Sequence, residues 1–466
     1  MTRHTKIVVT LGPAVATAEA IDGLVVAGMD VARLNFSHGD HDTHASLAAF
    51  VREAAARRDK TVAILQDIQG PKIRVGTFPG GVIRLRHGDR VVLIAGTGLG
   101  DAGRIEIGYS HLVDDVQVGS EVALADGLVR MVVTERLRDQ LVCEVTEGGP
   151  VSDHRGVAFP NTDLRVSAVT DKDEADLAFG RELDVDFVAA SFVRSAADVE
   201  RVQKLSGAPV IAKIELAAAV LDLDAILSVA EGVMVARGDL GVELPLEQLP
   251  AVQQDILRRT NAAGKISVTA TEMLESMTHS TRPTRAEVTD VATAVMEGTD
   301  AVMLSGETAV GDFPVETVAM MNRILVEADR PGPNHQLVGF LAEHGGYASA
   351  MARAAVEAAT DLGLETIVAF TESGSTARLL SKYRPGASIM AFSPEVRTRR
   401  RMAIYRGVMP IAFDRLDSTD AMIDLADRYL AEHSVCARGD GVVMVAGTPP
   451  NRGSTTNLMK LHTIGE

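Results

Sequence analysis

A lysine and two carboxylates follow neighbouring apolar runs in a pattern that suits chemistry on an anionic substrate. Lys213 and Glu215 lie two residues apart in PVIAKIE, and Asp239 comes just after the next run, GVMVA. Residues two apart on a strand point to the same face. Their oxygens suit Mg2+, and an ammonium beside them can stabilise a phosphoryl group in transfer. An isolated Lys213–Glu215 pair would indicate a structural salt bridge, and Asp239 favours a site instead.

Other polar residues also follow apolar runs, where the strands of a parallel barrel would end. The ends of such strands form the active site of (β/α)8 barrels, and polar residues without a function would be scattered without regard to them. Gly238 and Asp239 precede a predicted helical turn, whose N–H groups can hold a substrate carboxylate. The further residues at these ends are Arg33, Asn35, Ser37, His38, Asp67, Ser191, Arg237, Thr271 and Ser305.

Eight apolar, β-branched runs recur in the first 330 residues, with helix-length segments between them. Runs that are apolar on both faces and alternate with amphipathic segments such as 246–263 indicate parallel strands with crossover helices. Eight units of this kind predict a closed (β/α)8 TIM barrel, an α/β fold. The runs begin at Lys6, Val31, Val62, Phe187, Pro209, Gly232, Ile266 and Asp300.

The spacing of these runs breaks once, over residues 71–155. Short alternating runs and glycine-rich turns there predict an inserted small β-barrel lid domain. The remaining residues, 1–70 and 156–330, come close to the roughly 250 residues of a typical TIM barrel. After a predicted linker at 329–333, helices and strands alternate again. Residues 331–466 are therefore predicted to form an open C-terminal α/β domain with a regulatory role.

Composition limits the class of protein. The chain has 466 residues, 46% of them hydrophobic, and 46 Lys and Arg against 63 Asp and Glu, a net charge of -17. These values exclude a disordered or fibrous chain, and the negative charge argues against binding nucleic acid. Cys143 and Cys436 are too few for a disulfide framework. Without a signal peptide or a run of roughly 20 apolar residues, we expect a cytoplasmic protein that does not enter membranes.

Eight motifs in sequence order resemble those of pyruvate kinases. They span residues 32–309, and TESGSTARLLSKYRP at 371–385 extends the resemblance into the last domain. The resemblance implies transfer of the phosphoryl group of phosphoenolpyruvate to ADP, giving pyruvate and ATP. It also implies Mg2+, with Mn2+ as an alternative, a homotetramer, and regulation by a sugar phosphate or AMP. The motifs are ARLNFSHGD, DIQGPKIR, DFVAASFVR, AKIE, MVARGDLGVE, TATEMLESM, RPTRAEVTDVATAV and GTDAVMLSGETA.

Residue roles follow from the resemblance where the motifs match. Lys213 is implied to stabilise the transition state, and Glu215 and Asp239 to hold the magnesium. Thr271 and Ser305 are implied in delivering a proton to enolpyruvate, with water as the alternative donor. The implied catalytic residues are Lys213, Arg33, Thr271 and Ser305. The implied substrate-binding residues are Arg33, Lys213, Gly238, Asp239 and Thr271. The implied nucleotide-binding residues are Arg33, Asn35, His38, Arg74, Asp126 and Arg155.

Lys72 bears on the need for potassium. Family members with Glu at this position need potassium, whereas members with Lys resemble potassium-independent enzymes. A fixed ammonium can replace the charge of a bound monovalent cation. We therefore expect activity without potassium. The residues implied around the cation are Asn35, Ser37, Asp67 and the carbonyl of Ile68, with Lys72 as the internal replacement.

Three residues depart from the family pattern without removing a core charge. Leu216 replaces the Asn that usually follows the metal-binding Glu, Glu272 replaces a Gln, and Arg155 replaces a nucleotide-binding Lys. Arg155 keeps the positive charge, so an altered nucleotide preference is the expected consequence. The basic run 397–401, without interleaved aromatic residues, is interpreted as a solvated face or the rim of an effector site. His38, His41 and His44 are not interpreted as a transition-metal site.

A hydroxyl-rich loop after a predicted strand opens a helix at residues 371–376. Hydroxyl and N–H groups in this setting can hold a phosphate, although ordinary helix capping explains the same residue types. The resemblance favours an effector site. Its expected residues are Thr371, Ser373, Ser375, Thr376 and Arg452.

Two other functions compete with the kinase. A metal-dependent lyase or mutase acting on phosphoenolpyruvate or pyruvate would explain Glu215 and Asp239, but not Arg33, Arg74 and the inserted lid. A catalytically silent metabolite-binding regulator would be indicated by loss of Lys213 or of a carboxylate, and all of these residues are present.

Overall fold

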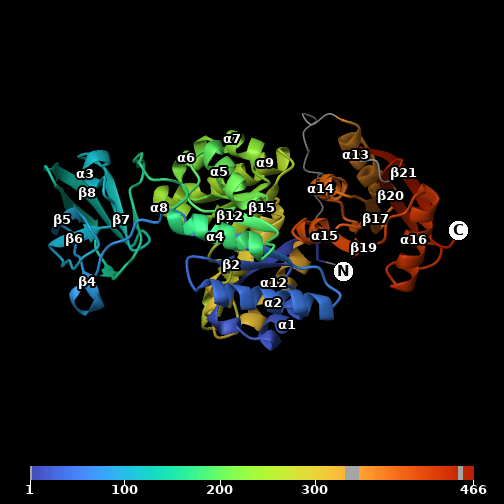
Figure 1. Ribbon diagram of the computed structural model, residues 1–466, viewed down its shortest axis with the longest axis horizontal. Coiled ribbons are helices and arrows are strands. Elements are labelled where there is room, and N and C mark those ends of the chain that lie inside the picture. The colour runs from blue at the N-terminus through green and yellow to red at the C-terminus, as the bar shows by residue number, and fades with distance from the viewer. Residues whose placement is uncertain (1–2, 331–345, 450–454) are drawn as a thin grey trace.

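The elements of the chain form three bodies in a row (Figure 1). The computed structural model describes residues 3–330, 346–449 and 455–466. An eight-stranded barrel lies in the middle, a β-rich lid at one end, and the C-terminal α/β domain at the other. In the described part of the chain, no helix is long and apolar enough to cross a membrane.

The central barrel is closed and wholly parallel, as predicted. Its order is β1-β16-β15-β14-β13-β12-β3-β2. Both faces of the strands are buried, which explains their continuous apolar character. The strands are β1 (Lys6–Leu11), β2 (Val31–Asn35), β3 (Ala63–Asp67), β12 (Phe187–Ala190), β13 (Val210–Ile214), β14 (Gly232–Ala236), β15 (Ile266–Ala270) and β16 (Ala301–Leu304).

Helices surround the barrel, and four of them, α1, α2, α4 and α10, begin with a side-chain N-cap. Thr170 and Asp173 form a reciprocal capping box at α4, and Thr284 and Glu287 form another at α10. The predicted amphipathic segment 246–263 contains a short 3-10 turn followed by α9. The helices are α1 (Ala18–Ala27), α2 (His41–Arg57), α4 (Asp171–Glu182), α5 (Ala196–Ser206), α6 (Ala217–Leu221), α7 (Leu223–Val229), α8 (Arg237–Glu243), α9 (Leu249–Ala262), α10 (Arg285–Met296), α11 (Gly306–Ala309) and α12 (Pro314–Ala328).

The lid contains a six-stranded sheet of order β11-β7-β8-β9-β5-β6 and a separate ribbon of β4 and β10. Single-residue bridges at Arg74 and Val75 reach Gly156 and Ile107, so the two edges of the sheet curl toward each other. The strands are β4 (Val82–Arg84), β5 (Arg90–Ala95), β6 (Arg104–Ile107), β7 (Glu121–Leu124), β8 (Val129–Arg136), β9 (Gln140–Glu147), β10 (Pro150–Ser152) and β11 (Val157–Ala158), with one helix, α3 (Leu112–Asp115).

The lid sheet extends past the boundary predicted at residue 155. Strand β11 pairs antiparallel with β7, and Phe159 is buried in the apolar core of the lid. Hydrogen bonding and burial therefore hold residues 157–159 on the lid, whereas the sequence analysis assigns them to the barrel.

The C-terminal domain is an open sheet of order β19-β18-β17-β20-β21, parallel except for the last strand. This agrees with the predicted open α/β fold, while residues 331–333 of the predicted linker lie outside the described residues. The elements are α13 (Tyr347–Asp361), β17 (Thr366–Phe370), α14 (Ser375–Lys382), β18 (Ser388–Ser393), α15 (Val396–Met402), β19 (Val408–Ala412), α16 (Thr419–Glu432), β20 (Gly441–Gly447) and β21 (Thr456–Thr463).

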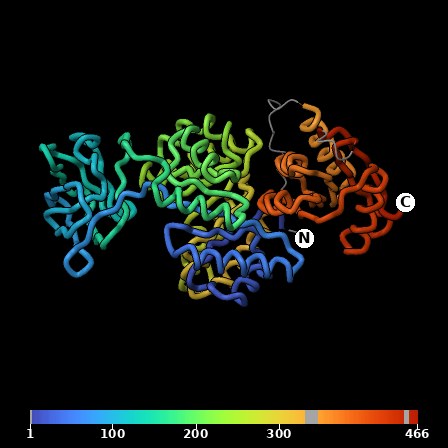
Figure 2. Tube along the Cα trace, viewed as in Figure 1, coloured from blue at the N-terminus to red at the C-terminus, as the bar shows by residue number. Residues whose placement is uncertain are grey.

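Buried polar contacts join the barrel to the C-terminal domain. The N-terminal segment lies beside this domain (Figure 2), where the carbonyl of His4 accepts a hydrogen bond from Gly407 N at 2.9 Å. Asp329 accepts from His4 N at 2.8 Å and pairs with Arg406 at 2.9 Å. Lys382 pairs with Asp300, and both side chains are buried. Charges without access to water need such partners.

His4 is expected to make unfolding dependent on pH. Burial, assisted by Arg406, lowers the pKa of His4 to about 4, whereas an unfolded histidine titrates near 6.5. As the pH falls from 7 to 5, the unfolded chain therefore gains a proton that the folded chain does not. Unfolding free energy should fall by about 2 kcal/mol from this residue.

Chemical denaturation of wild type and His4→Asn at the two pH values measures this contribution. The loss of stability should be smaller in His4→Asn and unchanged in His433→Asn, which alters an exposed histidine. Equal pH dependence in all three proteins would show that His4 does not contribute.

Candidate active site

Lys213 lies at the centre of the barrel mouth, held by residues from three neighbouring strand ends. Its Nζ lies 2.8 Å from Glu215 Oε1 and 3.3 Å from Asp67 Oδ1, and it donates to Ser191 Oγ at 2.8 Å. Burial acts to lower the pKa of Lys213, but Asp67 and Glu215 outweigh it and raise the pKa above its usual value. Lys213 therefore stays charged.

Asp67 connects Lys213 to a second cation. Arg33 Nε donates to Asp67 Oδ2 at 2.7 Å, and Arg33 Nη1 donates to Thr10 Oγ1 at 2.9 Å. Asp67 is 1% exposed. Burial acts to raise its pKa, but Arg33 and Lys213 prevail and lower it. One buried carboxylate thus orients both cations.

Glu215 is buried at the end of β13 with one oxygen fixed by the backbone. Its Oε2 accepts a hydrogen bond from Phe192 N at 2.6 Å. Its Oε1 forms the ion pair with Lys213 at 2.8 Å. Burial, and then the charge of Asp239, raise the pKa of Glu215 against the opposing effect of Lys213. A buried carboxylate is stabilised in its charged form by nearby cations.

Asp239 belongs to α8, which begins at Arg237 rather than after Asp239 as predicted. The N–H of Gly238 donates to Thr271 Oγ1 at 2.9 Å, so that N–H already has a partner. Thr271 and Glu272 both have positive φ angles, of 69° and 53°. Such angles are unfavourable for residues with a Cβ, especially a β-branched one, and strained residues of this kind cluster at functional sites.

Ser305 follows β16 and has a buried Oγ without a hydrogen-bond partner. Its backbone N donates to Glu307 Oε2 at 2.6 Å, and Leu274 N donates to Glu307 Oε1 at 3.1 Å. Glu307 therefore fixes the loops that follow β15 and β16. The hydroxyl of Ser305 remains available to a bound molecule or to water.

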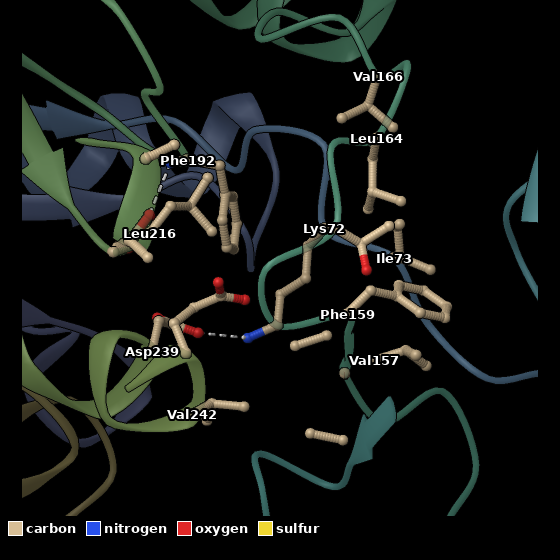
Figure 3. Close-up of a pocket in the computed structure, with 18 of the residues that line it drawn as sticks. Lys72, Ile73, Val157, Phe159, Leu164, Val166, Phe192, Leu216, Asp239 and Val242 are labelled. Carbon is tan, nitrogen blue, oxygen red and sulfur yellow. Dashed lines mark hydrogen bonds and ion pairs between the residues drawn. The ribbon is translucent and has the colours of Figure 1, made fainter. Parts of the chain in front are cut away.

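A cavity of about 400 Å3 separates the barrel mouth from the lid. Figure 3 shows Phe159, Leu164 and Val166 facing Phe192 and Leu216 across it. Lys72, Glu215 and Asp239 are among its polar residues. An apolar, lid-covered space next to charged groups limits access of water, which strengthens electrostatic interactions.

Lys72 has partners other than those expected for a replacement of potassium. Its Nζ lies 3.5 Å from Asp239 Oδ1 and 3.7 Å from Asp126 Oδ1. Within the described part of the chain, Asn35, Ser37 and Asp67 are not among its ion-pair or hydrogen-bond partners. Of the expected cation ligands, Asp67 binds Arg33 and Lys213, the Ile68 carbonyl accepts from Ser191 Oγ at 2.7 Å, and Asn35 Oδ1 accepts from Ser37 N at 3.2 Å.

The expected nucleotide-side residues are divided between barrel and lid. Asn35 is the last residue of β2, and exposed His38 follows this strand. On the lid side, Arg74 donates to the His154 carbonyl at 2.9 Å, and Arg155 Nη1 lies 3.6 Å from Asp126 Oδ2. His41 pairs with Asp176 at 2.9 Å and stacks on Phe179. These contacts account for His41 without a metal.

The carboxylates fit magnesium better than a transition metal. Glu215 and Asp239 line the same cavity. Among residues 3–330, 346–449 and 455–466, no group of three or more His, Cys, Asp and Glu could hold a metal alone. Mg2+ typically takes one or two carboxylates and completes its shell with water and substrate oxygens, whereas zinc takes three or four protein ligands.

The hydroxyl-rich loop at 371–376 lines a second cavity, of about 460 Å3, in the C-terminal domain. Thr371 Oγ1 accepts from Gly374 N at 2.9 Å, which is a turn contact, and the hydroxyls of Ser373 and Ser375 lie 3.1 Å apart. Thr376 Oγ1 lies 2.7 Å from Thr456 Oγ1. The structure thus brings together Thr371, Ser373, Ser375 and Thr376, while Arg452 lies outside the described residues.

Cations held on buried carboxylates at a barrel mouth, beneath a separate lid, define an enzyme that acts on small anionic substrates. A family model described as pyruvate kinase, barrel domain, matches residues 2–318, and one described as pyruvate kinase, alpha/beta domain, matches residues 349–462. The chain therefore belongs to the pyruvate kinase family, whose members are phosphotransferases.

Individual relatives agree over the whole chain. It is 40% identical to a pyruvate kinase of Geobacillus stearothermophilus, covering 100% of this chain and 81% of the relative. It is 39% identical to one of Clostridium perfringens, covering 99% and 100%. A pyruvate kinase structure from Cryptosporidium parvum aligns with a TM-score of 0.93 at 38% identity, covering 99% and 96%.

Sequence reasoning missed several supporting contacts. Ser191 was noted only as a strand-end residue, whereas it bonds Lys213 and the Ile68 carbonyl. Asp67 was assigned to a monovalent cation and not to Arg33 and Lys213. The sequence pattern does not point to Glu307, which fixes the loops after β15 and β16. The position of Asp67 at the end of a buried strand was the available signal, because a buried carboxylate needs cationic partners.

Proposed function

We propose that this chain transfers the phosphoryl group of phosphoenolpyruvate to ADP with Mg2+, by means of the cations at the barrel mouth. The bond between phosphorus and the enol oxygen breaks, and one to a terminal oxygen of ADP forms. Enolpyruvate then takes a proton at its methylene carbon, giving pyruvate and ATP. The observation that carries the proposal is the charged Lys213, fixed between Asp67 and Glu215 under the lid.

The arrangement stabilises the negative charge of the phosphoryl group during its transfer. Arg33 and Lys213 present positive charge that Asp67 holds in place, so little reorganisation accompanies the reaction. Glu215 and Asp239 would hold Mg2+, which supplies further positive charge to phosphoryl oxygens when bound. The apolar walls of the lid cavity exclude water, which would otherwise accept the phosphoryl group.

The same geometry supports roles at the two ends of the substrate. Thr271 and the start of α8 flank the space beside Asp239, which suits the substrate carboxylate. The unpartnered Oγ of Ser305 can position a water or take part in proton delivery with Thr271. Asn35, His38, Arg74 and Arg155 would bind the nucleotide. Product analysis in deuterated water tests protonation, since each pyruvate should acquire one deuterium.

The decisive assay is ATP formation from ADP and phosphoenolpyruvate with and without magnesium. ATP must form in proportion to pyruvate, and its formation must stop when EDTA removes the metal. A lyase or mutase would consume phosphoenolpyruvate without making ATP. A silent regulator would bind the substrates and leave them unchanged.

Activity is expected without potassium. The ammonium of Lys72 lines the same cavity as Asp239, so the chain itself supplies a positive charge beside the site. Turnover in buffer free of sodium and potassium should change by less than about tenfold when KCl is added. Tetramethylammonium chloride at equal ionic strength is the control. A larger rise specific to potassium would defeat the proposal.

Regulation through the C-terminal cavity is a further part of the proposal. The hydroxyls of Thr371, Ser373, Ser375 and Thr376 line the cavity at the start of α14, as a phosphate site requires. Titration of sugar phosphates and AMP at sub-saturating phosphoenolpyruvate should shift the rate in wild type and not in Ser375→Val.

Light scattering tests the proposed homotetramer, since a monomer mass would contradict it.

A further inference from the structure

Four charges of alternating sign run from the barrel to the lid. Asp239 Oδ1 lies 3.5 Å from Lys72 Nζ, which lies 3.7 Å from Asp126 Oδ1. Asp126 Oδ2 in turn lies 3.6 Å from Arg155 Nη1. Figure 3 shows the first of these contacts crossing the cavity from Lys72 to Asp239. Each inner residue therefore has two partners of opposite charge.

The lid is shaped to bring Asp126 to this position. Asp126 lies at the tip of the β7–β8 hairpin, where Ala125, Asp126 and Gly127 have successive positive φ angles of 53°, 57° and 87°. The tip rests on α8, because a Cβ on Gly127 would lie 3.3 Å from Val242 Cγ2. Helix α8 also carries Asp239. The lid carboxylate and the metal-site carboxylate thus face each other across Lys72.

A glycine leaves room for the central pair. A Cβ on Gly156 would lie 3.0 Å from Lys72 Cε and 3.1 Å from Asp126 Oδ1. Both distances are closer than ordinary van der Waals contact. An alanine at this position would therefore displace the side chains of Lys72 and Asp126 from their present positions.

Ligands at the two ends of this chain would compete for its outer members. A divalent cation held by Glu215 and Asp239 repels the ammonium of Lys72 and needs the Asp239 oxygens. A phosphate bound by Arg155 draws that guanidinium from Asp126. When both ligands are bound, Lys72 has lost Asp239 and Asp126 has lost Arg155, so Lys72 and Asp126 remain paired with each other. The two ligands therefore favour the same arrangement, which is the condition for positive coupling between sites.

We propose that Asp126 is a positioning residue that accepts Lys72 when a metal takes Asp239, and thereby couples the metal site to the nucleotide phosphates and the lid. This assigns Asp126 a role other than direct contact with the anionic nucleotide, whose phosphates it would repel. The proposal deepens the proposed function and rests on its metal and nucleotide sites.

Direct binding of Mn2+ to the substrate-free protein, followed by the EPR signal of free Mn2+, tests the coupling without an activity assay. Binding at the site is defined as that lost in Glu215→Gln. Asp126→Asn should weaken it about fivefold, the upper end of what an exposed ion pair contributes. Gly156→Ala should weaken it in the same direction. Lys72→Met should strengthen it, because the competing ammonium is gone.

The combination with Lys72→Met separates coupling from loss of one negative charge. Asp126→Asn should change Mn2+ affinity less than about twofold when Lys72 is already methionine. Glu144→Gln, which neutralises an exposed lid carboxylate on β9, is the matched control and should have no effect. An equal effect of Asp126→Asn with and without Lys72 would overturn the proposal.

The outcomes also separate this proposal from the proposed function. Wild type that forms ATP while Asp126→Asn binds Mn2+ normally would refute the coupling alone. Absence of ATP formation by wild type would refute the kinase, whatever the Mn2+ affinities are. Hydrogen exchange at residues 123–130 adds a readout of the lid, because Mg2+ should increase protection of the hairpin tip in wild type and not in Asp126→Asn.

Discussion

Lys213→Met is expected to lower kcat by about 1000-fold or more while the protein stays folded. The ammonium of Lys213 lies between Asp67 and Glu215, close to where phosphoryl oxygens would bind. Removing one preorganised charge from such a site typically costs about 100- to 1000-fold in rate, and Lys213 also compensates the charge of Glu215. Methionine keeps a similar length and removes only the charge. Coupled measurement of ATP formation over a range of phosphoenolpyruvate concentrations gives kcat and KM separately.

Lys265→Met is the matched control for this variant. Lys265 lies just before β15, at the opposite end of the barrel, and donates to the Ala230 carbonyl at 2.6 Å. In this fold, residues at that end of the barrel contribute to stability rather than to the chemistry. Its kcat should stay within about twofold of wild type. If Lys213→Met lost less than tenfold in kcat, Lys213 could not be the group that stabilises the transferred phosphoryl.

The barrel could be predicted because each of its strands and helices has a recognisable pattern within its own short stretch of sequence. Runs such as 210–214 and 232–236 are apolar on both faces, and each is followed by a segment with helical periodicity. The placement of Lys213 and Glu215 at the mouth follows from the same periodicity. Local pattern also predicted the open C-terminal α/β domain.

Contacts between domains could not be obtained in this way. The ammonium of Lys72 reaches Asp126, 54 positions along the chain, and Asp239, in a different domain, and the position of the lid decides both distances. The extent of the lid sheet depends on tertiary pairing as well. Val157 and Ala158 have no local signal that separates a lid strand from a barrel segment, and their pairing with β7 settles it.

Side-chain choice at the barrel mouth is likewise a tertiary property. The sequence places Asp67 at a strand end, but it does not show which of the basic residues at the barrel mouth pair with it. Only packing shows that Arg33 Nε and Lys213 Nζ both approach this carboxylate, at 2.7 and 3.3 Å. A residue assigned to a bound monovalent cation is therefore used to hold two cations that belong to the protein.

Asp67→Asn is accordingly expected to affect both stability and rate. Asparagine keeps the shape and loses the charge that compensates Arg33 and Lys213 in a buried site. Removing one partner of a buried ion pair typically costs about 3 to 5 kcal/mol of stability. The two cations would also lose their common anchor, and misplacement by about 1 Å can cost 100-fold in rate. Denaturant unfolding and steady-state kinetics measure the two effects on the same sample.

Asp186→Asn separates the rate effect from general destabilisation. Asp186 is also buried, pairs with Arg52 at 2.9 Å and accepts from Ile64 N at 2.7 Å, but it precedes β12 at the far end of the barrel. Its loss should cost similar stability and leave kcat within about twofold of wild type. If both variants lost rate equally, the effect of Asp67 would be one of stability. A rate loss confined to Asp67→Asn requires that this carboxylate positions Arg33 and Lys213 for the reaction.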